Sequence, residues 1–224
     1  MHIEPGIVNG AKIALSYATA AGAGWYSLKL TLQSLQSAGI ASFASRCVLA
    51  MAATFTFFQV LPHFPVGVSE VHFILGSTLF LLFGAAPASF GLAAGLLLQG
   101  LLFAPTDLPQ YFINITTLLV PLFAVSALAK RVIAPNTAYV DLSYAQALKL
   151  STTYQAGVVA WVAFWAFYGQ GFGAETLASV TSFGLAYMLV IIIEPLVDLA
   201  VLAGAKAMRS LEKTGFVQAR VYSA

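Results

Sequence analysis

The first two residues of the chain, Met1 and His2, carry nitrogen atoms at a spacing that suits a metal ion. The α-amine of Met1, the peptide nitrogen of His2 and the His2 imidazole can close on one cation as a three-nitrogen chelate. Imidazole suits nickel, copper, iron and zinc, and a planar set of nitrogens favours Ni(II) or Cu(II). A fourth nitrogen would complete the plane, and the only other histidines are His63 and His72. The competing interpretation is a chance histidine at a frayed terminus, because disorder concentrates at chain ends.

The composition is typical of a membrane protein. Of the 224 residues, 60% are hydrophobic and 8% are charged, whereas a soluble domain carries roughly 25% charged residues. The net charge of +2 is too small to indicate nucleic acid as a partner. A single cysteine, Cys47, excludes an internal disulfide. The opening residues lack the basic region of a cleavable signal peptide, so we expect Met1 to be the mature first residue.

Uncharged apolar runs of about 18 or more residues predict membrane helices. One run, residues 71–106, is too long for a single span, and the proline-containing segment 84–89 divides it in two. The sequence therefore predicts an all-α polytopic membrane helix bundle of about seven transmembrane helices, in a single transmembrane domain, 1–224. The predicted spans are about 7–28, 38–62, the two parts of 71–106, 108–129, 150–174 and 176–205.

Basic residues predict the orientation, because they accumulate in cytoplasmic loops. If the N-terminus lies outside and the C-terminus lies in the cytoplasm, every basic residue except Lys12 falls on the inner side. The same orientation puts His2, His63 and His72 in one compartment, which favours a shared site. The inner basic residues are Lys29, Arg46, Lys130, Arg131, Lys149, Lys206, Arg209, Lys213 and Arg220.

The predicted external loop, residues 61–76, contains both of the other histidines. Pro62 and Pro65 hold its backbone extended. Irregular backbone at membrane depth is tolerated only where protein buries it or where it lines a cavity. We hypothesise that this loop folds back beneath the metal-binding N-terminus, residues 1–6, and presents an imidazole. The alternative is a surface loop whose histidines lie at the level of the lipid headgroups.

Glu194 and Asp198 lie four residues apart, on one face of the last predicted span. Ionisable residues inside a membrane are costly and usually face the interior of a bundle. One interpretation is a coupling role, in which the pair relays a cation. We prefer a structural or partner-docking role, because Pro195 lies between the two residues and the pair is close to the cytoplasmic end of the span.

Three further patterns concern helix packing, the source of energy and the membrane interface. Gly91 and Gly95 are four residues apart, which permits close approach of two helices. The chain lacks the Gly-x-x-x-x-Gly-Lys-Ser/Thr loop that cradles nucleotide phosphates, so uphill transport would draw its energy from another subunit or an ion gradient. A cluster of aromatic residues predicts an interfacial belt; its members are Trp161, Phe164, Trp165, Phe167 and Tyr168.

Four segments carry a family resemblance. The chain opens Met1-His2-Ile3-x-x-Gly6, residues 59–67 read Gln-Val-Leu-Pro-His-Phe-Pro-Val-Gly, and residues 96–103 contain Gln99, followed by Asn114. Ile193-Glu194 falls where the last helix of the family usually carries Ala-Glu-Gly. In these positions the chain resembles the substrate-binding membrane subunits (S components) of cobalt and nickel energy-coupling-factor (ECF) transporters. The resemblance spans nearly the whole chain.

The resemblance implies a metal site built from Met1, His2 and a loop histidine. His72 lies within one sequence position of the loop histidine found in nickel-type members of the family. His63 lies within one position of the loop histidine found in cobalt-type members, so both stay candidates. The usual loop, Gly-Thr-Ser-Gly-His or Ser-His-Pro-Thr-Gly, is replaced here, and Glu70 has no counterpart. Gln99 and Asn114 are candidates to support the ligands, and Glu194 and Asp198 stay candidates for coupling or structure.

The resemblance also implies the transported substrate and the partners. The substrate would be Co²⁺ or Ni²⁺, with no organic cofactor and no enzymatic activity in this chain. The partners would be a transmembrane coupling (T) subunit, two ATPase subunits and the lipid bilayer of a bacterial or archaeal cell membrane; the need for a small accessory membrane subunit is left open.

Two other functions compete with this interpretation. A gradient-driven metal permease would use Glu194 and Asp198 as coupling sites. A membrane redox protein would use His63 and His72 as haem or copper ligands.

Overall fold

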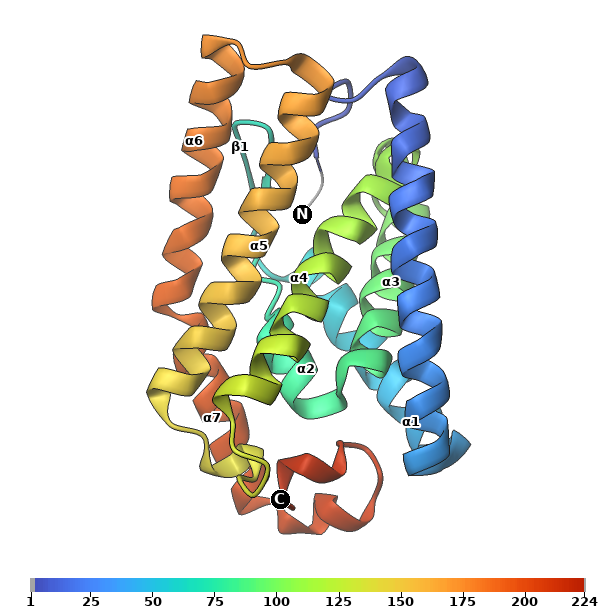
Figure 1. Ribbon diagram of the computed structural model, residues 1–224, viewed down its shortest axis with the longest axis vertical. Helices are drawn as coiled ribbons and strands as arrows, with labels where there is room; N and C mark the ends of the chain where they lie inside the picture. The colour runs from blue at the N-terminus through green and yellow to red at the C-terminus, as the bar shows by residue number, and fades with distance from the viewer. Residues whose placement is uncertain (1–2, 224) are drawn as a thin grey trace.

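The computed structural model describes residues 3–223, and these residues form a helical bundle with one small hairpin (Figure 1). The all-α prediction is confirmed apart from that hairpin. The main helices are α1 (Ala14–Phe55), α2 (Gly76–Phe83), α3 (Ala85–Leu102), α4 (Tyr111–Val132), α5 (Tyr144–Gln170), α6 (Ala174–Met188) and α7 (Glu194–Ala207). The hairpin consists of β1 (Phe64–Val66) and β2 (Ser69–Val71).

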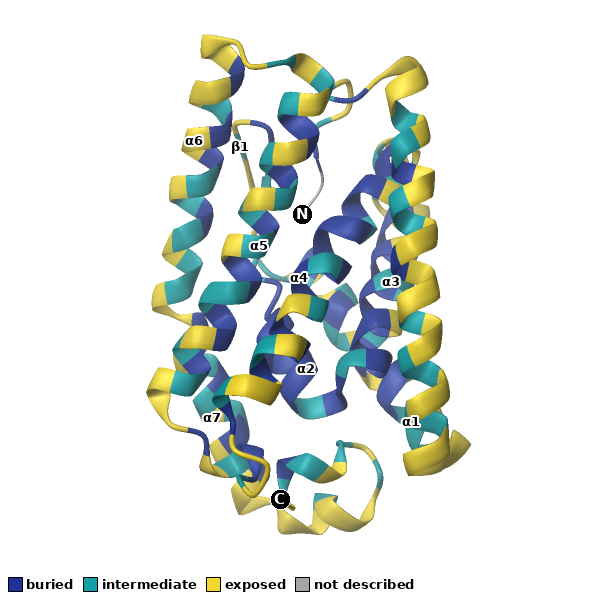
Figure 2. Ribbon diagram, in the orientation of Figure 1, coloured by how far each residue is buried: buried dark blue, intermediate teal, exposed yellow. Residues whose placement is uncertain are grey.

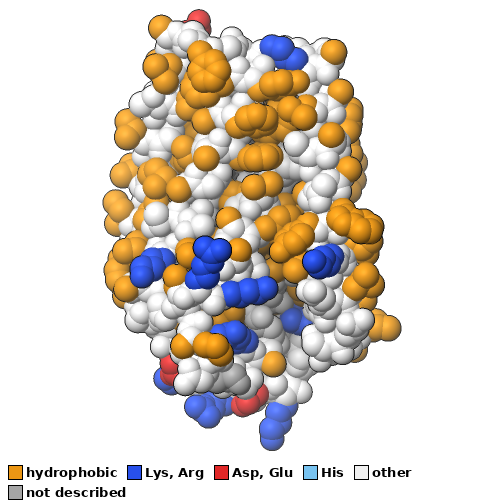
Figure 3. Space-filling model, in the orientation of Figure 1, with side chains coloured by type: hydrophobic (Ala, Val, Ile, Leu, Met, Phe, Trp, Pro, Cys, Tyr) orange, Lys and Arg blue, Asp and Glu red, His pale blue; other side chains and the backbone are white. Residues whose placement is uncertain are grey.

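Within the described residues, four helical stretches are long and apolar enough to cross a membrane. They are Gly10–Val60, Ala85–Leu102, Pro105–Val132 and Ala174–Ala207. The surface agrees with a membrane location, because apolar side chains cover most of the visible face and Lys and Arg gather towards its lower end (Figure 3). These four stretches do not confirm the predicted count of seven crossings.

Helix α1 contains a break at Gly39, where the backbone adopts φ 78° and ψ 166°. Only glycine adopts this conformation without strain. The predicted boundary near residue 28 is therefore wrong, and Lys29 lies within the helix, not in a loop. Residues 29–38 include one Lys, two Gln and three Leu. These are good helix formers, so the helix continues until Gly39.

The segment 71–106 does not form two full spans, which corrects the sequence prediction. Its first part contributes the end of the hairpin and then α2, which has 8 residues. Eight residues rise about 12 Å, less than half of a hydrocarbon core of about 30 Å. Every residue of α2 except Leu82 is buried (Figure 2). Hydropathy cannot separate such a short buried helix from a span, because both consist of apolar residues.

The predicted break between the two parts is confirmed, and Gly84 makes it. Gly84 has φ 85° and separates α2 from α3. Pro87 lies in the first turn of α3, where a proline costs no intrahelical hydrogen bond.

Helix α3 packs closely on the second arm of α1, as the pair Gly91 and Gly95 predicts. A Cβ on Gly91 would lie 2.4 Å from the Ala50 Cβ, and a Cβ on Gly95 would lie 2.7 Å from the Thr54 Cβ. Side chains at these positions would force the helices apart, so the glycines set their separation.

Candidate metal centre

The hairpin β1–β2 forms the base of the candidate site. Its strands are antiparallel, with Pro65 opposite Glu70 and Val66 opposite Ser69. Gly67 makes the turn with φ 61°, and a Cβ there would lie 2.1 Å from the Ser179 carbonyl oxygen on α6. Val68 and Ser69 are buried. The hairpin is therefore inserted into the bundle in its upper half and packed against α6 (Figure 1).

The N-terminal segment lies on this hairpin. Ile3 forms an isolated antiparallel bridge with Ser69, and the Glu4 amide donates to the Val68 carbonyl at 3.1 Å. The Ile3 amide donates to the Asn114 Oδ1 at 2.9 Å, which ties the same residue to α4. These bonds fix the chain immediately after His2 between the hairpin and α4. Met1 and His2 themselves, the predicted amine, amide and imidazole donors, lie outside the described residues.

Apolar packing reinforces this attachment. Ile3, Val8, Ile113 and Trp165 form a buried cluster of their own. Trp165 has an exposed fraction of 0%, so it does not belong to an interfacial belt, and the prediction for that residue is wrong. Trp161 donates its indole N–H to the Thr116 Oγ1 at 3.1 Å. Two of the aromatic residues of α5 thus face α4 and support the N-terminal segment.

The far end of the segment is held by the end of α5. Lys12 Nζ donates to the Gly169 carbonyl at 2.8 Å, and the Gln110 side chain donates to the Val8 carbonyl at 3.2 Å. A cation at a helix C-terminus interacts favourably with the helix dipole. This contact explains the position of Lys12, the one basic residue that did not follow the predicted charge distribution.

The rings of His63 and His72 lie side by side. Their rings stack with centroids 4.8 Å apart and an interplanar angle of 13°. The two side chains differ in burial: His72 is 1% exposed, whereas His63 is exposed. The Phe58 ring packs on His72 with centroids 4.7 Å apart.

Glu70 is bonded to the buried histidine. His72 Nε2 and Glu70 Oε2 are 2.9 Å apart, and the Glu70 side chain is partly exposed. A carboxylate on one ring nitrogen fixes the tautomer and orientation of an imidazole, which is the usual support for a metal-ligating histidine. Sequence reasoning had no role for Glu70, although its position two residues before His72 in an extended strand puts both side chains on one face.

Three carboxylates gather near this end of the N-terminal segment: Glu4, Glu70 and Asp107, here called the acidic cluster. Burial raises the pKa of Glu4, and the charges of Glu70 and Asp107 raise it further. All three side chains are partly exposed. Their combined negative potential favours the approach of a cation.

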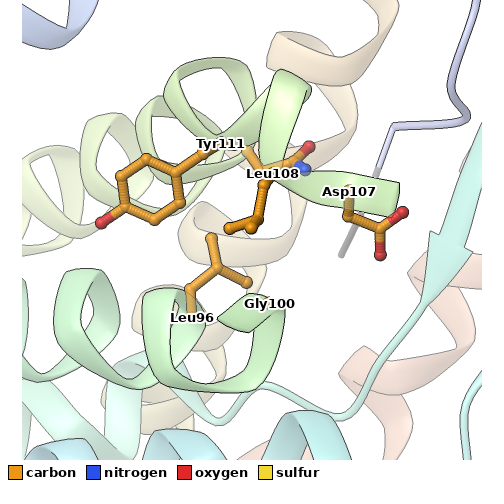
Figure 4. A pocket seen from close by; sticks show the side chains of 6 residues that line it. Leu96, Gly100, Asp107, Leu108 and Tyr111 are labelled. Carbon is orange, nitrogen blue, oxygen red and sulfur yellow. The ribbon is translucent and has the colours of Figure 1, made fainter. Parts of the chain in front are cut away.

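Asn114 and Gln99 occupy different positions. Asn114 is buried and bonded to Ile3, whereas Gln99 donates to the Gln59 Oε1 at 3.5 Å. A small cavity of about 10 Å³ lies beside Asn114. In Figure 4, Leu96 and Leu108 face each other across this cavity, and Asp107 lies at its far side. Such a volume is about that of one water-sized probe.

Glu194 and Asp198 lie elsewhere, on α7 in the lower half of the bundle (Figure 1). Both are 0% exposed, so they are not available for docking a partner. Ser77 Oγ contacts Glu194 Oε1 at 3.1 Å and Asp198 Oδ2 at 2.7 Å, and Thr78 donates to Asp198. Donors on α5 complete the set: Ser151 and Gln155 both donate to Glu194 Oε2. The pair therefore joins α7 to α2 and α5.

Residues 3–223 contain no group of three or more His, Cys, Asp or Glu side chains placed to hold one metal ion. What they do contain is a buried imidazole, a carboxylate bonded to it and a fixed N-terminal strand. These features give the helical bundle one polar end, with a buried imidazole beside partly exposed carboxylates.

Comparison with known families identifies the class further. Residues 2–211 match the family model for the cobalt uptake substrate-specific transmembrane region, CbiM, and the chain belongs to this family. The resemblance to S components drawn from the sequence motifs is thereby confirmed. Members of the family are membrane components of multi-subunit cobalt uptake transporters, not enzymes. Searches of curated proteins and of solved structures found no match.

Proposed function

We propose that this chain is the metal-capturing S component of an ECF-type ABC importer for divalent cobalt or nickel. The Met1 amine, the His2 amide nitrogen, the His2 imidazole and one loop histidine would bind the ion. The observation that carries this proposal is the bridge between Ile3 and Ser69. It ties the residue that follows His2 to the strand that leads to His72.

Chain geometry supports a shared site. Successive Cα atoms are about 3.8 Å apart, so two residues before Ile3 remain within roughly 8 Å of it. Ile3 is held by Ser69 and Asn114, and His72 follows Ser69 by three residues. A backbone fixed at this point would limit the entropy lost on closing a chelate ring, which favours binding by preorganisation.

Burial and hydrogen bonding favour His72 over His63 as the fourth ligand. In this assignment the contact between Glu70 and His72 Nε2 would orient the imidazole, and the carboxylate would raise the basicity of the ring. His63 is exposed and stacks on the outer face of His72. We therefore assign His63 to the rim of the site. The acidic cluster would attract the divalent ion from solution.

The family assignment supports operation within a multi-subunit uptake transporter. We propose a transmembrane coupling subunit and two ATPase subunits as the source of energy. The N-terminus would face outside and the C-terminus the cytoplasm, because the basic side chains gather at the end where the C-terminus lies (Figures 1 and 3).

The test is equilibrium binding of Co²⁺ and Ni²⁺ to purified protein with a C-terminal tag and an unblocked N-terminus. We expect one ion per chain. His2→Ala should lower metal affinity by about 100-fold or more, since loss of residues that only support the ligands already lowers affinity by roughly 10–100-fold. Asn9→Ala, an exposed change in the same segment, is the control. Unchanged affinity in a folded His2→Ala protein would refute the proposed site.

A further inference from the structure

A large cavity lies at the end of the bundle opposite the candidate metal centre. It has a volume of about 380 Å³ and is bounded by both arms of α1, the start of α3, the end of α4 and the C-terminal segment. Three basic residues line it: Arg46, Lys130 and Arg220. Among the described residues that line the cavity, none is Asp or Glu. The cavity therefore carries three positive charges without an internal counter-charge.

The hydrogen bonds of these residues go to neutral acceptors. Arg46 is 4% exposed and donates to the carbonyls of Phe83 and Ser42 and to the Ser34 hydroxyl. Arg220 donates through Nη2 to the Ala134 carbonyl at 2.9 Å, and its buried Nε has no acceptor among the described residues. The ion pairs within residues 3–223 involve none of the three. A buried guanidinium without a carboxylate favours binding of an external anion.

The polar part of the lining suits an oxyanion. Ser34, Ser37 and Ser126 line the cavity beside the cations, and their hydroxyls can donate further, weaker hydrogen bonds to phosphate oxygens. A site that combines several cations with hydroxyl donors matches the chemistry of a phosphate group.

A second cavity, of about 180 Å³, lies further along the same three helices, α1, α3 and α4. Thr31 lines it one turn before Ser34 on α1, and Ser89 lines it one turn after Ala86 on α3. Most of its surface is apolar, with Leu28, Phe90, Ile115 and Leu119 among the lining residues. The pair of cavities is thus polar and basic towards the end of the bundle and apolar towards its middle. Figure 3 shows the same division on the visible face, with basic side chains below apolar ones.

We propose that these cavities bind one anionic phospholipid, with its phosphate between Arg46, Lys130 and Arg220 and an acyl chain along the apolar cavity. An amphipathic ligand fits both halves of the site, whereas a free phosphate ion would use only the basic half. Basic pockets between transmembrane helices at the cytoplasmic side are suited to lipid headgroups.

Native mass spectrometry of delipidated protein tests this proposal, with phosphatidylglycerol, phosphatidylcholine and inorganic phosphate as separate probes. We expect wild-type protein to retain one phosphatidylglycerol and to bind phosphatidylcholine more weakly. Lys130→Gln with Arg220→Gln should weaken phosphatidylglycerol binding roughly 30-fold. The double variant Arg209→Gln with Lys213→Gln removes the same charge from exposed positions outside the cavity and should bind like wild type.

Three results would overturn the proposal. The first is an equal loss of phosphatidylglycerol binding in both double variants, which would indicate non-specific electrostatic attraction. The second is full competition by inorganic phosphate, which would assign the site to a free anion. The third arises in the assembled transporter: a Ser37→Cys cross-link to another protein chain, with no lipid retained, would assign the cavity to an acidic protein segment.

Discussion

The candidate metal centre and the Glu194–Asp198 pair contain similar chemical groups in opposite settings. At the metal centre the carboxylates of the acidic cluster are partly exposed, and the backbone of the N-terminal segment completes the site. Around Glu194 and Asp198 every contact comes from a helix of the bundle, and both side chains are fully buried. The difference indicates that capture requires access for an ion, whereas joining three helices requires closure.

The largest effect should follow from removing the buried histidine. His72→Ala should weaken Co²⁺ or Ni²⁺ binding by about 100-fold or more, because it removes a proposed ligand that a carboxylate orients. His63→Ala should change affinity less than about threefold, since rim residues contribute little. Calorimetric titration of both variants checks this pair. Normal affinity for His72→Ala together with a defective His63→Ala would transfer the ligand assignment to His63.

Glu70→Gln should give the next largest effect. It keeps the shape of the side chain but removes the charge that supports His72, so we expect a 10- to 100-fold loss of affinity, roughly the range known for such supporting groups. Glu175→Gln, the same substitution at an exposed position of α6, serves as the control. Equal affinities of the two variants would show that the contact between Glu70 and His72 has no influence on the metal.

Gly67→Ala tests the placement of the hairpin. The added Cβ would meet the Ser179 carbonyl, so the hairpin must shift and affinity should fall about tenfold. Gly171→Ala is matched to it, because Gly171 also has positive φ but no atom lies within 4 Å of its Cβ position. The control should lower stability, because alanine is strained at φ 83° and ψ 178°, and should leave metal affinity unchanged. A reduced affinity in both variants would point to general destabilisation.

Glu194→Gln should have the smallest effect on metal affinity, less than about twofold in the folded protein. It places an amide N–H₂ among groups that donate to Glu194, so stability should fall by about 1–3 kcal/mol. Thermal unfolding in detergent and metal titration on the same sample separate the two quantities. A large loss of affinity with an intact fold would break the separation between the two regions.

The sequence predicted the residue types of the site better than their arrangement. The opening motif and the family resemblance named Met1, His2, His63, His72 and Asn114. Met1 and His2 lie outside the described residues, and the metal-binding role of the set stays a prediction. The choice between His63 and His72 was left open, since burial is decided by how the hairpin enters the bundle. The role of Trp165 was missed because its contact with Ile3 joins residues far apart in the sequence.

The fold could be predicted as far as hydropathy carries information. Hydropathy and the proline-containing segment identified an all-α membrane bundle and the break at Gly84. The small residues Gly91 and Gly95 indicated a close helix pair. Hydropathy did not identify α2 as a short buried helix, because apolar residues serve equally against lipid and against protein. It also ended the first helix too early, since polar residues of high helix propensity precede Gly39.

The central claim is that the amino terminus itself binds the metal. One alanine added before Met1 turns the α-amine into an amide and moves His2 to the third position, out of register with the loop histidine. The rest of the chain, including the bridge between Ile3 and Ser69, is unchanged in sequence. Co²⁺ and Ni²⁺ titrations of the native and extended proteins, both with C-terminal tags and verified free N-termini, test the claim. We predict that the extended protein loses about 100-fold or more in affinity; equally tight binding by both proteins would contradict it.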